Sequence, residues 1–171
     1  PQWYINSCFK IKYMFPKAHA AAYMISALRL GWYKVHKPVE YYAAYFTVRG
    51  EDFDGATVVK GRPAVQQRMH EIQQKGKEAS AKETAAFGTL QIVNEMLARG
   101  IGVLPIDLYK SDARKYLVED GKVRLPFASI SGVGESAANA LAAAKDGGTY
   151  ISIDDLQARS KVSKSVIEIY V

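Results

Sequence analysis

Cysteine is nearly absent from this sequence of 171 residues, which contains only Cys8. A single cysteine cannot close an internal disulfide, so a disulfide-stabilised scaffold is excluded and nothing indicates an oxidising compartment. Long hydrophobic runs are lacking as well. The longest, residues 18–30, is interrupted by His19, Ser26 and Arg29, and crossing a bilayer takes roughly 18 uninterrupted apolar residues. We therefore expect a cytoplasmic protein that does not contact membranes.

Groups that bind metal ions are few and badly spaced. The three histidines are scattered, and the one cysteine does not complete a zinc-ligand spacing with them. Asp52 and Asp54 form a D-x-D pattern, which can hold a divalent ion in two-metal phosphoryl transfer. They lie between two glycines in a segment that joins helical blocks, so we interpret them as a solvated turn or a helix cap. Nucleophilic triads have no supporting motif, and we predict no catalytic and no metal-binding residue in this chain.

The sequence does contain enough hydrophobic residues for a globular core, and it has an excess of positive charge. Hydrophobic residues make up 49% and charged residues 23%, which is ordinary for one domain or two small ones. The net charge of +6 suits a polyanion such as nucleic acid, but a solvated lysine surface would produce it equally well. The first residues, Pro1-Gln2-Trp3, lack a methionine and a signal peptide, so we expect a piece of a longer chain.

The apolar spacing predicts a mainly α fold in three blocks. In the first block, residues 1–50, Pro16 begins a helix with apolar residues at helical spacing, and Pro38 ends it and begins another. In the second block, residues 51–100, two helices form a scaffold, and the capping box Ser80-x-x-Glu83 begins the second of them.

The third block, residues 101–171, combines a small β-hairpin with short helices. Residues 116–118 and 123–125 flank an Asp120-Gly121 turn, and Asp-Gly accommodates the positive φ of a hairpin turn. A helix follows Gly134, Ser152-x-x-Asp155 caps a short one, and Ser163 caps a last one. No internal repeat is evident.

The most informative segment is Ile130-Ser131-Gly132-Val133-Gly134-Glu135-Ser136. Two glycines one residue apart let the backbone turn sharply and come close to a ligand. Because they open directly onto a helix, successive N–H groups and the positive end of the helix dipole converge on one anion. This pattern is typical of a helix-hairpin-helix motif, which holds a nucleic-acid backbone without reading bases. The predicted DNA-binding residues are Ser131, Gly132, Val133, Gly134, Glu135, Ser136, Arg159, Lys161 and Lys164.

Two other interpretations apply to a Gly-x-Gly segment before a helix. A dinucleotide-binding loop is excluded, because no later parallel strand carries an acidic residue for a ribose. A plain Gly-x-Gly turn before a helix stays open.

A second basic segment surrounds the start of the first long helix. Lys10, Lys12 and Lys17 lie close to His19, with Tyr13 between them. Such a cluster can neutralise a triphosphate while an aromatic ring stacks on a base. A solvated basic patch explains the same residues, and spacing alone leaves both interpretations open.

Several runs resemble one family closely, the PolC-type alpha subunit of bacterial DNA polymerase III. They are KIKYMFPKAHAAAY (residues 10–23), YYAAYFTVR (41–49), DLYKSDA (107–113), the glycines at 132 and 134, and DLQARSKVSK (155–164). The resemblance covers nearly the whole chain and is looser over residues 61–100. It implies the end of the polymerase fingers in residues 1–50, a connecting scaffold in 51–100, and a duplex-binding subdomain in 101–171.

The resemblance also implies a reaction and partners for a longer protein. That reaction is DNA-templated nucleotidyl transfer with Mg²⁺, and its partners are primer-template duplex, an incoming deoxynucleotide, the sliding clamp and other replisome subunits. Tyr13, Lys17 and His19 match the region that faces the nucleotide. Asp52 and Asp54 do not match the metal-binding aspartates, which lie upstream in the palm, so this chain is expected to need no cofactor and to be inactive alone. The clamp-binding tail follows Tyr170 in the family, beyond this sequence.

Two rival interpretations of the whole chain stay open, and each makes a prediction that can be tested. One is a DNA repair protein, because helix-hairpin-helix motifs also occur in base-excision glycosylases, and such an enzyme would cleave damaged duplex. The other is a structural helical module with a non-specific basic surface. It predicts that Gly132 and Gly134 can be replaced without loss of DNA binding.

Overall fold

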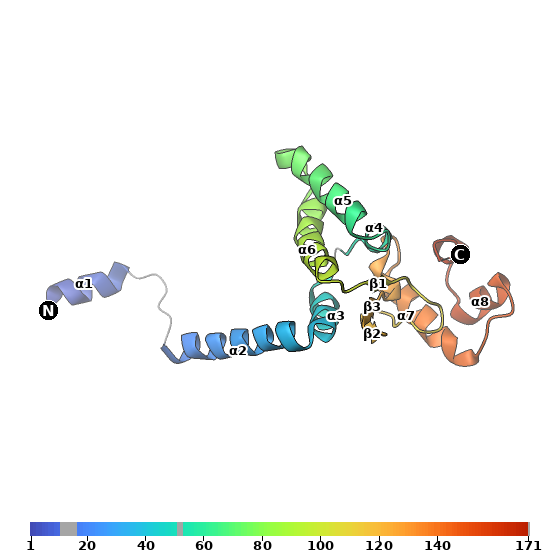
Figure 1. Cartoon of the computed structure of the whole chain (residues 1–171), viewed down its shortest axis with the longest axis horizontal. Helices are drawn as coiled ribbons and strands as arrows, with labels where there is room; N and C mark the ends of the chain where they lie inside the picture. The colour runs from blue at the N-terminus through green and yellow to red at the C-terminus, as the bar shows by residue number, and fades with distance from the viewer. Residues whose placement is uncertain (11–16, 51–52, 171) are drawn as a thin grey trace. The chain divides into compact units, whose positions relative to one another are not determined.

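The computed structural model describes residues 1–10, 17–50 and 53–170, and the chain divides into two compact units, Pro1–Pro38 and Val39–Val171 (Figure 1). Both units are mainly helical, which confirms the predicted fold class. The division into compact units does not test the three functional blocks 1–50, 51–100 and 101–171, which stay a prediction.

The first unit contains α1 (Gln2–Lys10) and α2 (Lys17–His36). Pro38 lies just beyond the end of α2, as the sequence predicts, because a proline disfavours helical backbone in the residue before it. Neither helix has a buried side chain among its residues. Large apolar side chains such as Phe9, Leu28 and Trp32 are exposed instead. The described part of this unit therefore builds no core of its own.

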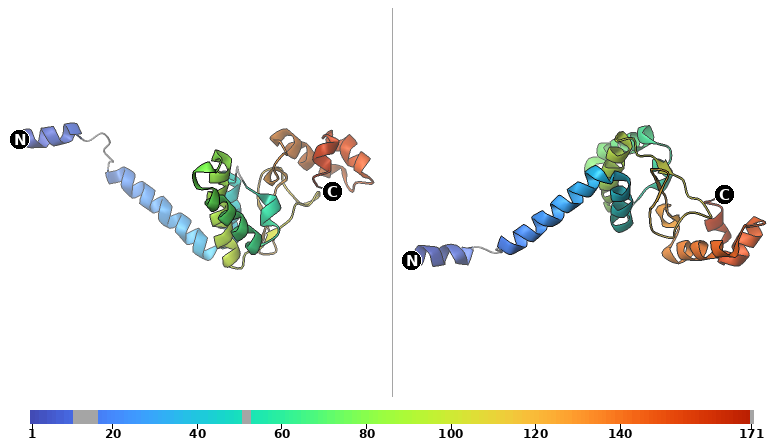
Figure 2. Two further views of the ribbon diagram at one scale, coloured as in Figure 1. Left: turned by 90° about the horizontal axis from the view of Figure 1, so that it is seen from above. Right: turned by 60° about the horizontal axis from the view of Figure 1, so that its bottom comes forward.

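The second unit begins with helices that surround a first hydrophobic core. They are α3 (Pro38–Arg49), α4 (Gly55–Val58), α5 (Arg62–Lys75), the 3-10 turn η1 (Gly76–Glu78) and α6 (Ala81–Ala98). The helices α5 and α6 pack along each other, as both views in Figure 2 show. The core buries Tyr42, Phe46, Val65, Leu90 and Met96. The predicted capping box is present at the start of α6, where Ser80 and Glu83 each accept from the other's backbone N–H.

A small sheet follows, made of β1 (Val103–Leu104), β2 (Leu117–Glu119) and β3 (Lys122–Arg124) in the order β1-β3-β2. The predicted hairpin is the antiparallel pair of β2 and β3, and its turn residues Asp120 (φ 51°) and Gly121 (φ 71°) have the positive φ that the Asp-Gly pair favours. The sequence did not predict that β1 pairs in parallel with β3. The partner of β1 lies far along the chain, and a local hydrophobic pattern does not report which strand pairs with which.

The last part of the chain forms a second hydrophobic cluster. It contains the 3-10 turn η2 (Phe127–Ser129), α7 (Glu135–Ala144), the 3-10 turn η3 (Lys145–Gly147), α8 (Ile153–Ser160) and α9 (Lys164–Ile167). Phe127, Leu141 and Leu156 are among the buried residues. Ile106 packs against both clusters, so the two cores of the second unit are continuous through it. Ser152 caps α8 as predicted, with its side chain accepting from the N–H of Asp155.

Candidate nucleic-acid interface

The predicted Gly-x-Gly segment forms a tight connection, residues 130–134, which we call the first hairpin. The N–H of Val133 donates to the carbonyl of Ile130 at 3.3 Å and closes the turn. Gly132 has a φ of +96°, a backbone conformation that residues other than glycine rarely adopt. The side chain of Val133 packs against the second hydrophobic cluster. A glycine and an apolar anchor thus fix the path of this connection.

Gly134 has a different role from Gly132. It is the N-cap residue of α7 in ordinary extended backbone (φ −72°, ψ 159°), so its conformation does not require glycine. No side chain caps the first N–H groups of α7, and a Cβ at Gly134 would meet nothing within 4 Å. The N-terminus of a helix of 10 residues is therefore open to an approaching anion. Ser131, Glu135 and Ser136 are exposed around it.

Residues 159–163, 29 positions later, share several features with the first hairpin, and we call them the second hairpin. Lys161 has a φ of +54° at the position of Gly132, and Ser163 (φ −64°, ψ 148°) is the N-cap of α9 at the position of Gly134. The apolar positions coincide too: Phe127, Val133 and Ala138 correspond to Leu156, Val162 and Ile167 in the same cluster. The expectation that the chain has no internal repeat stays a prediction, because the two segments share these positions only. Lysine and serine replace both glycines, and both segments have the spacing S-x-V-x-x-S, which begins at Ser131 and at Ser160.

The two hairpins differ in charge. The first carries no Lys or Arg over residues 130–138, and its one acid, Glu135, forms an ion pair with Arg114 at 2.7 Å. The second carries Lys161 and Lys164, both exposed, and neither forms a salt bridge with any residue that the structure describes.

Arg159 is engaged inside the protein. Its guanidinium donates to the carbonyls of Gly148 at 3.1 Å and Thr149 at 2.8 Å, and to the carboxylate of Asp155 at 2.8 Å. It also stacks over the ring of Tyr150, 4.3 Å from its centroid. These contacts hold the loop between α7 and α8. The predicted contact of Arg159 with DNA is untested and stays a prediction.

A hollow of about 500 Å³ lies beside the first hairpin. Residues 130–133 line one side of it, and the beginning of α6 with Arg68 of α5 and Asp54 lines the other. Lys82 reaches across, and its ammonium donates to Ser131 Oγ at 3.4 Å. Helix α6 of the scaffold thus contacts the hairpin, which neither segment of the sequence predicts by itself.

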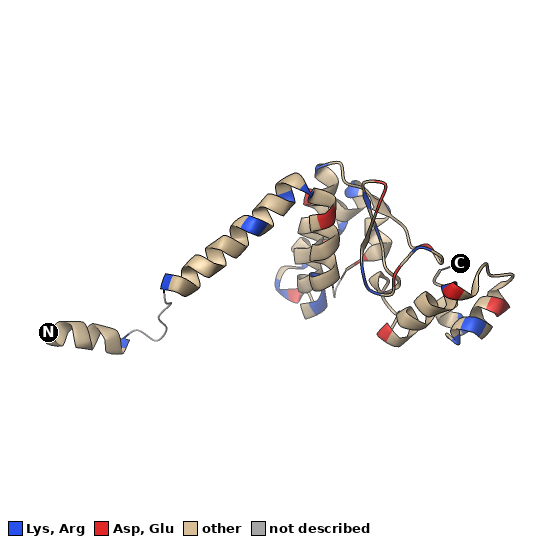
Figure 3. Ribbon diagram, turned by 90° about the horizontal axis from the view of Figure 1, so that it is seen from below, with Lys and Arg blue, Asp and Glu red and all other residues tan. Residues whose placement is uncertain are grey.

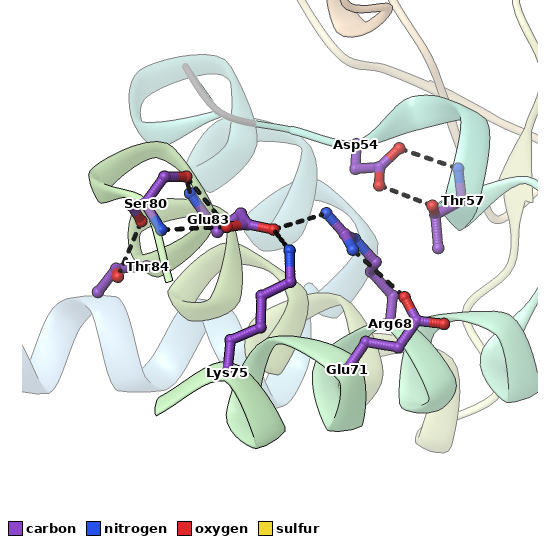
Figure 4. Close-up of polar contacts among 8 residues, drawn as sticks. All are labelled: Asp54, Thr57, Arg68, Glu71, Lys75, Ser80, Glu83 and Thr84. Atoms are coloured by element: carbon purple, nitrogen blue, oxygen red, sulfur yellow. Dashed lines mark hydrogen bonds and ion pairs between the residues drawn. The ribbon is translucent and has the colours of Figure 1, made fainter. Parts of the chain in front are cut away.

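Two other charged groups of this hollow, Arg68 and Glu83, form ion pairs (Figure 4). Arg68 lies 3.2 Å from Glu71 and 3.5 Å from Glu83, and Lys75 lies 2.5 Å from Glu83. Hydrogen bonds from Lys75 and from the backbone of Ser80 lower the pKa of Glu83 to about 2, so this carboxylate is ionised at neutral pH.

Asp54 is a helix cap, as one interpretation of the D-x-D pattern predicts. Its carboxylate accepts from the N–H of Thr57 at 3.1 Å and from the Thr57 hydroxyl at 2.6 Å (Figure 4). Asp52 lies outside the described residues. Across residues 1–10, 17–50 and 53–170, no group of three or more His, Cys, Asp or Glu side chains could hold a metal ion. In the same ranges no helix is long and apolar enough to cross a membrane.

The net charge of the chain resides in its first unit. Residues 1–38 contain six basic and no acidic side chains, whereas residues 39–171 contain 17 of each. Figure 3 shows basic but no acidic residues on α1 and α2. The unit that carries both hairpins has no net charge, so any affinity of this unit for a polyanion depends on local geometry rather than on overall charge.

The residues predicted to face a nucleotide lie in this basic unit. Lys17 and His19 occupy the first turn of α2, and the ring of His19 contacts that of Tyr23 at a centroid distance of 4.4 Å. Tyr13 lies outside the described residues. The structure therefore locates two of these three residues on one helix turn and does not test their role.

Comparison with known proteins connects these features. The helix-hairpin-helix motif family matches residues 100–171. Two relatives named DNA polymerase III PolC-type, from Listeria innocua and Halalkalibacterium halodurans, are each 49% identical over 168 residues, and the Bacillus subtilis relative is 47% identical. These alignments cover 98% of this chain, but the chain spans only 12% of the length of each relative. The predicted resemblance is confirmed: the chain matches one segment of PolC-type DNA polymerase III and carries a helix-hairpin-helix motif.

Proposed function

We propose that this chain is the part of a bacterial replicative DNA polymerase that holds the backbone of duplex DNA. The observation that carries the proposal is the first hairpin, which presents an uncapped helix N-terminus behind a glycine with open space in front of it. N–H groups in this arrangement bind phosphate and read no bases, which suits an enzyme that must act on every sequence.

The second hairpin supplies a further contact of the same kind. It shares the positive-φ residue and the extended N-cap of the first, and it presents the ammonium groups of Lys161 and Lys164 to solvent. Two hairpins in one hydrophobic cluster can hold two backbone positions of one duplex. We expect Arg159 to support DNA binding indirectly, by holding the loop between α7 and α8.

The longer polymerase would add deoxynucleotides to a primer on a template with Mg²⁺, and it would engage the sliding clamp and other replisome subunits. In that protein, Lys17 and His19 on the first turn of α2, with Tyr13 close in sequence, would contribute to binding of the incoming deoxynucleotide. The metal-binding aspartates would come from the palm, outside this chain. We therefore expect the chain alone to polymerise nothing.

Fluorescence anisotropy on primed duplex DNA over a salt series tests the proposal, with Gly134→Asp as the decisive variant. Gly134 tolerates a side chain, and aspartate is a favourable N-cap residue, so α7 should become more stable. The same carboxylate should repel a phosphate at this position, and binding should fall. Asn139→Asp adds an equal charge at an exposed position further along α7 and is the matched control.

The two variants separate the proposal from its rivals. Loss of binding by Gly134→Asp, with binding retained by Asn139→Asp, supports a phosphate site at the first hairpin. Equal binding by both variants would favour a structural module with a non-specific basic surface. Cleavage of a duplex with a damaged base would favour a repair enzyme.

A further inference from the structure

The first hairpin lacks the cation that the second one has. In the second hairpin, Lys161 and Lys164 come from the hairpin and from the helix that follows it. The corresponding positions of the first hairpin are Gly132 and Glu135, and Arg114 neutralises this acid at 2.7 Å. If both hairpins hold phosphates, the first relies on N–H groups alone or takes its cation from another part of the chain.

The structure brings one lysine to this place. Lys82, in the first turn of α6, lies 49 positions before Ser131 in sequence, and its ammonium donates to Ser131 Oγ at 3.4 Å. Both residues line the hollow of about 500 Å³, together with Gly132 and Val133. A cation is thus held beside the positive-φ turn of the first hairpin, the position that corresponds to Lys161 in the second.

The charge of Lys82 is available to a ligand, unlike the other charges around the hollow. Arg68 is held between Glu71 and Glu83, Glu83 is also bound by Lys75, and the Asp54 carboxylate accepts from Thr57. Within the described residues, Lys82 has no acidic partner and contacts a neutral hydroxyl. An ammonium without a carboxylate partner binds a phosphate without first breaking an ion pair.

We infer that Lys82 binds a backbone phosphate of the duplex strand held by the first hairpin. The scaffold helix α6 therefore contributes directly to the DNA interface, and residues 51–100 do more than connect. This inference rests on the proposed function, because it assigns one more contact to the same interface.

The test measures binding of the 171-residue chain to primed duplex DNA across a salt series, with Lys82→Gln as the variant. Glutamine removes the charge and keeps a polar side chain, and its helix propensity is close to that of lysine. Lys77→Gln removes an exposed charge from η1, outside the hollow, and is the matched control. Ser131→Ala removes the neutral contact and keeps the ammonium. Thermal melts check that every variant is folded.

Loss of one phosphate contact should reduce the slope of log K against log salt by about 0.9, which is about eightfold in affinity at 0.1 M salt. We expect this change for Lys82→Gln and not for Lys77→Gln or Ser131→Ala. Equal slopes for Lys82→Gln and Lys77→Gln, with Gly134→Asp still impaired, would overturn this inference and leave the proposed function intact. If the unsubstituted chain does not bind duplex at all, the proposed function fails and the inference fails with it.

Discussion

Replacing Lys161 with glycine should raise the stability of the chain and weaken its binding to DNA at the same time. Lys161 ends α8 in the left-handed conformation, with φ 54° and ψ 21°. This conformation costs a residue with a Cβ about 1–2 kcal/mol, and glycine avoids that cost. Glycine also gains more freedom in the unfolded chain, which subtracts about 0.5–1 kcal/mol. The net stabilisation should be about 0.5–1 kcal/mol.

For a chain of this length, that stabilisation corresponds to a rise of about 1–4 °C in Tm. The effect on DNA has the opposite sign, because the substitution removes one exposed ammonium from the second hairpin. If Lys161 contacts one phosphate, the salt slope of binding should fall by about 0.9. A general loss of folding would lower both quantities, so a rise in one with a fall in the other identifies the local cause.

Lys164→Gln is the matched comparison for this experiment. It removes a charge at the start of α9 and changes no left-handed residue, so binding should fall while Tm stays within about 1 °C. Differential scanning calorimetry and anisotropy on the same preparations give both quantities. A lower Tm for Lys161→Gly would refute the account of backbone strain, and an unchanged salt slope would remove Lys161 from the DNA interface.

Two further predictions concern stability. The pKa of Glu83 is about 2 in the folded chain, below its ordinary value of 4.5. The ionised carboxylate therefore contributes its full share of folding stability above pH 4.5, and this contribution is lost as the pH falls towards 2. Glu83→Gln should therefore flatten the dependence of Tm on pH between 4.5 and 2. Glu78→Gln, an exposed control in η1, should retain that dependence. Identical pH profiles for the two variants would contradict the assignment of this dependence to Glu83. Tyr170→Phe removes the hydrogen bond from the tyrosine hydroxyl to the carbonyl of Phe127 at 2.7 Å but keeps the edge contact of the two rings. Urea denaturation should show a loss of about 1–2 kcal/mol, and no loss would mean that water replaces the hydroxyl.

The sequence by itself determined the features that depend on neighbouring residues. Prolines and capping residues predicted where α2, α6 and α8 begin or end, Asp120-Gly121 predicted the turn between β2 and β3, and the glycines at 132 and 134 predicted the first hairpin. These features could be predicted because caps, turns and positive φ have energies set within a few residues of the chain.

Tertiary structure alone decided which distant parts of the chain contact these local elements. It joined β1 to β3, engaged Arg159 with its own loop, and brought Lys82 to Ser131 across 49 positions. It also held Lys161 in a left-handed conformation that lysine disfavours, at the position that Gly132 occupies in the first hairpin. Packing of the shared hydrophobic cluster supplies the free energy for that conformation, and such packing energy is not encoded in any short stretch of residues.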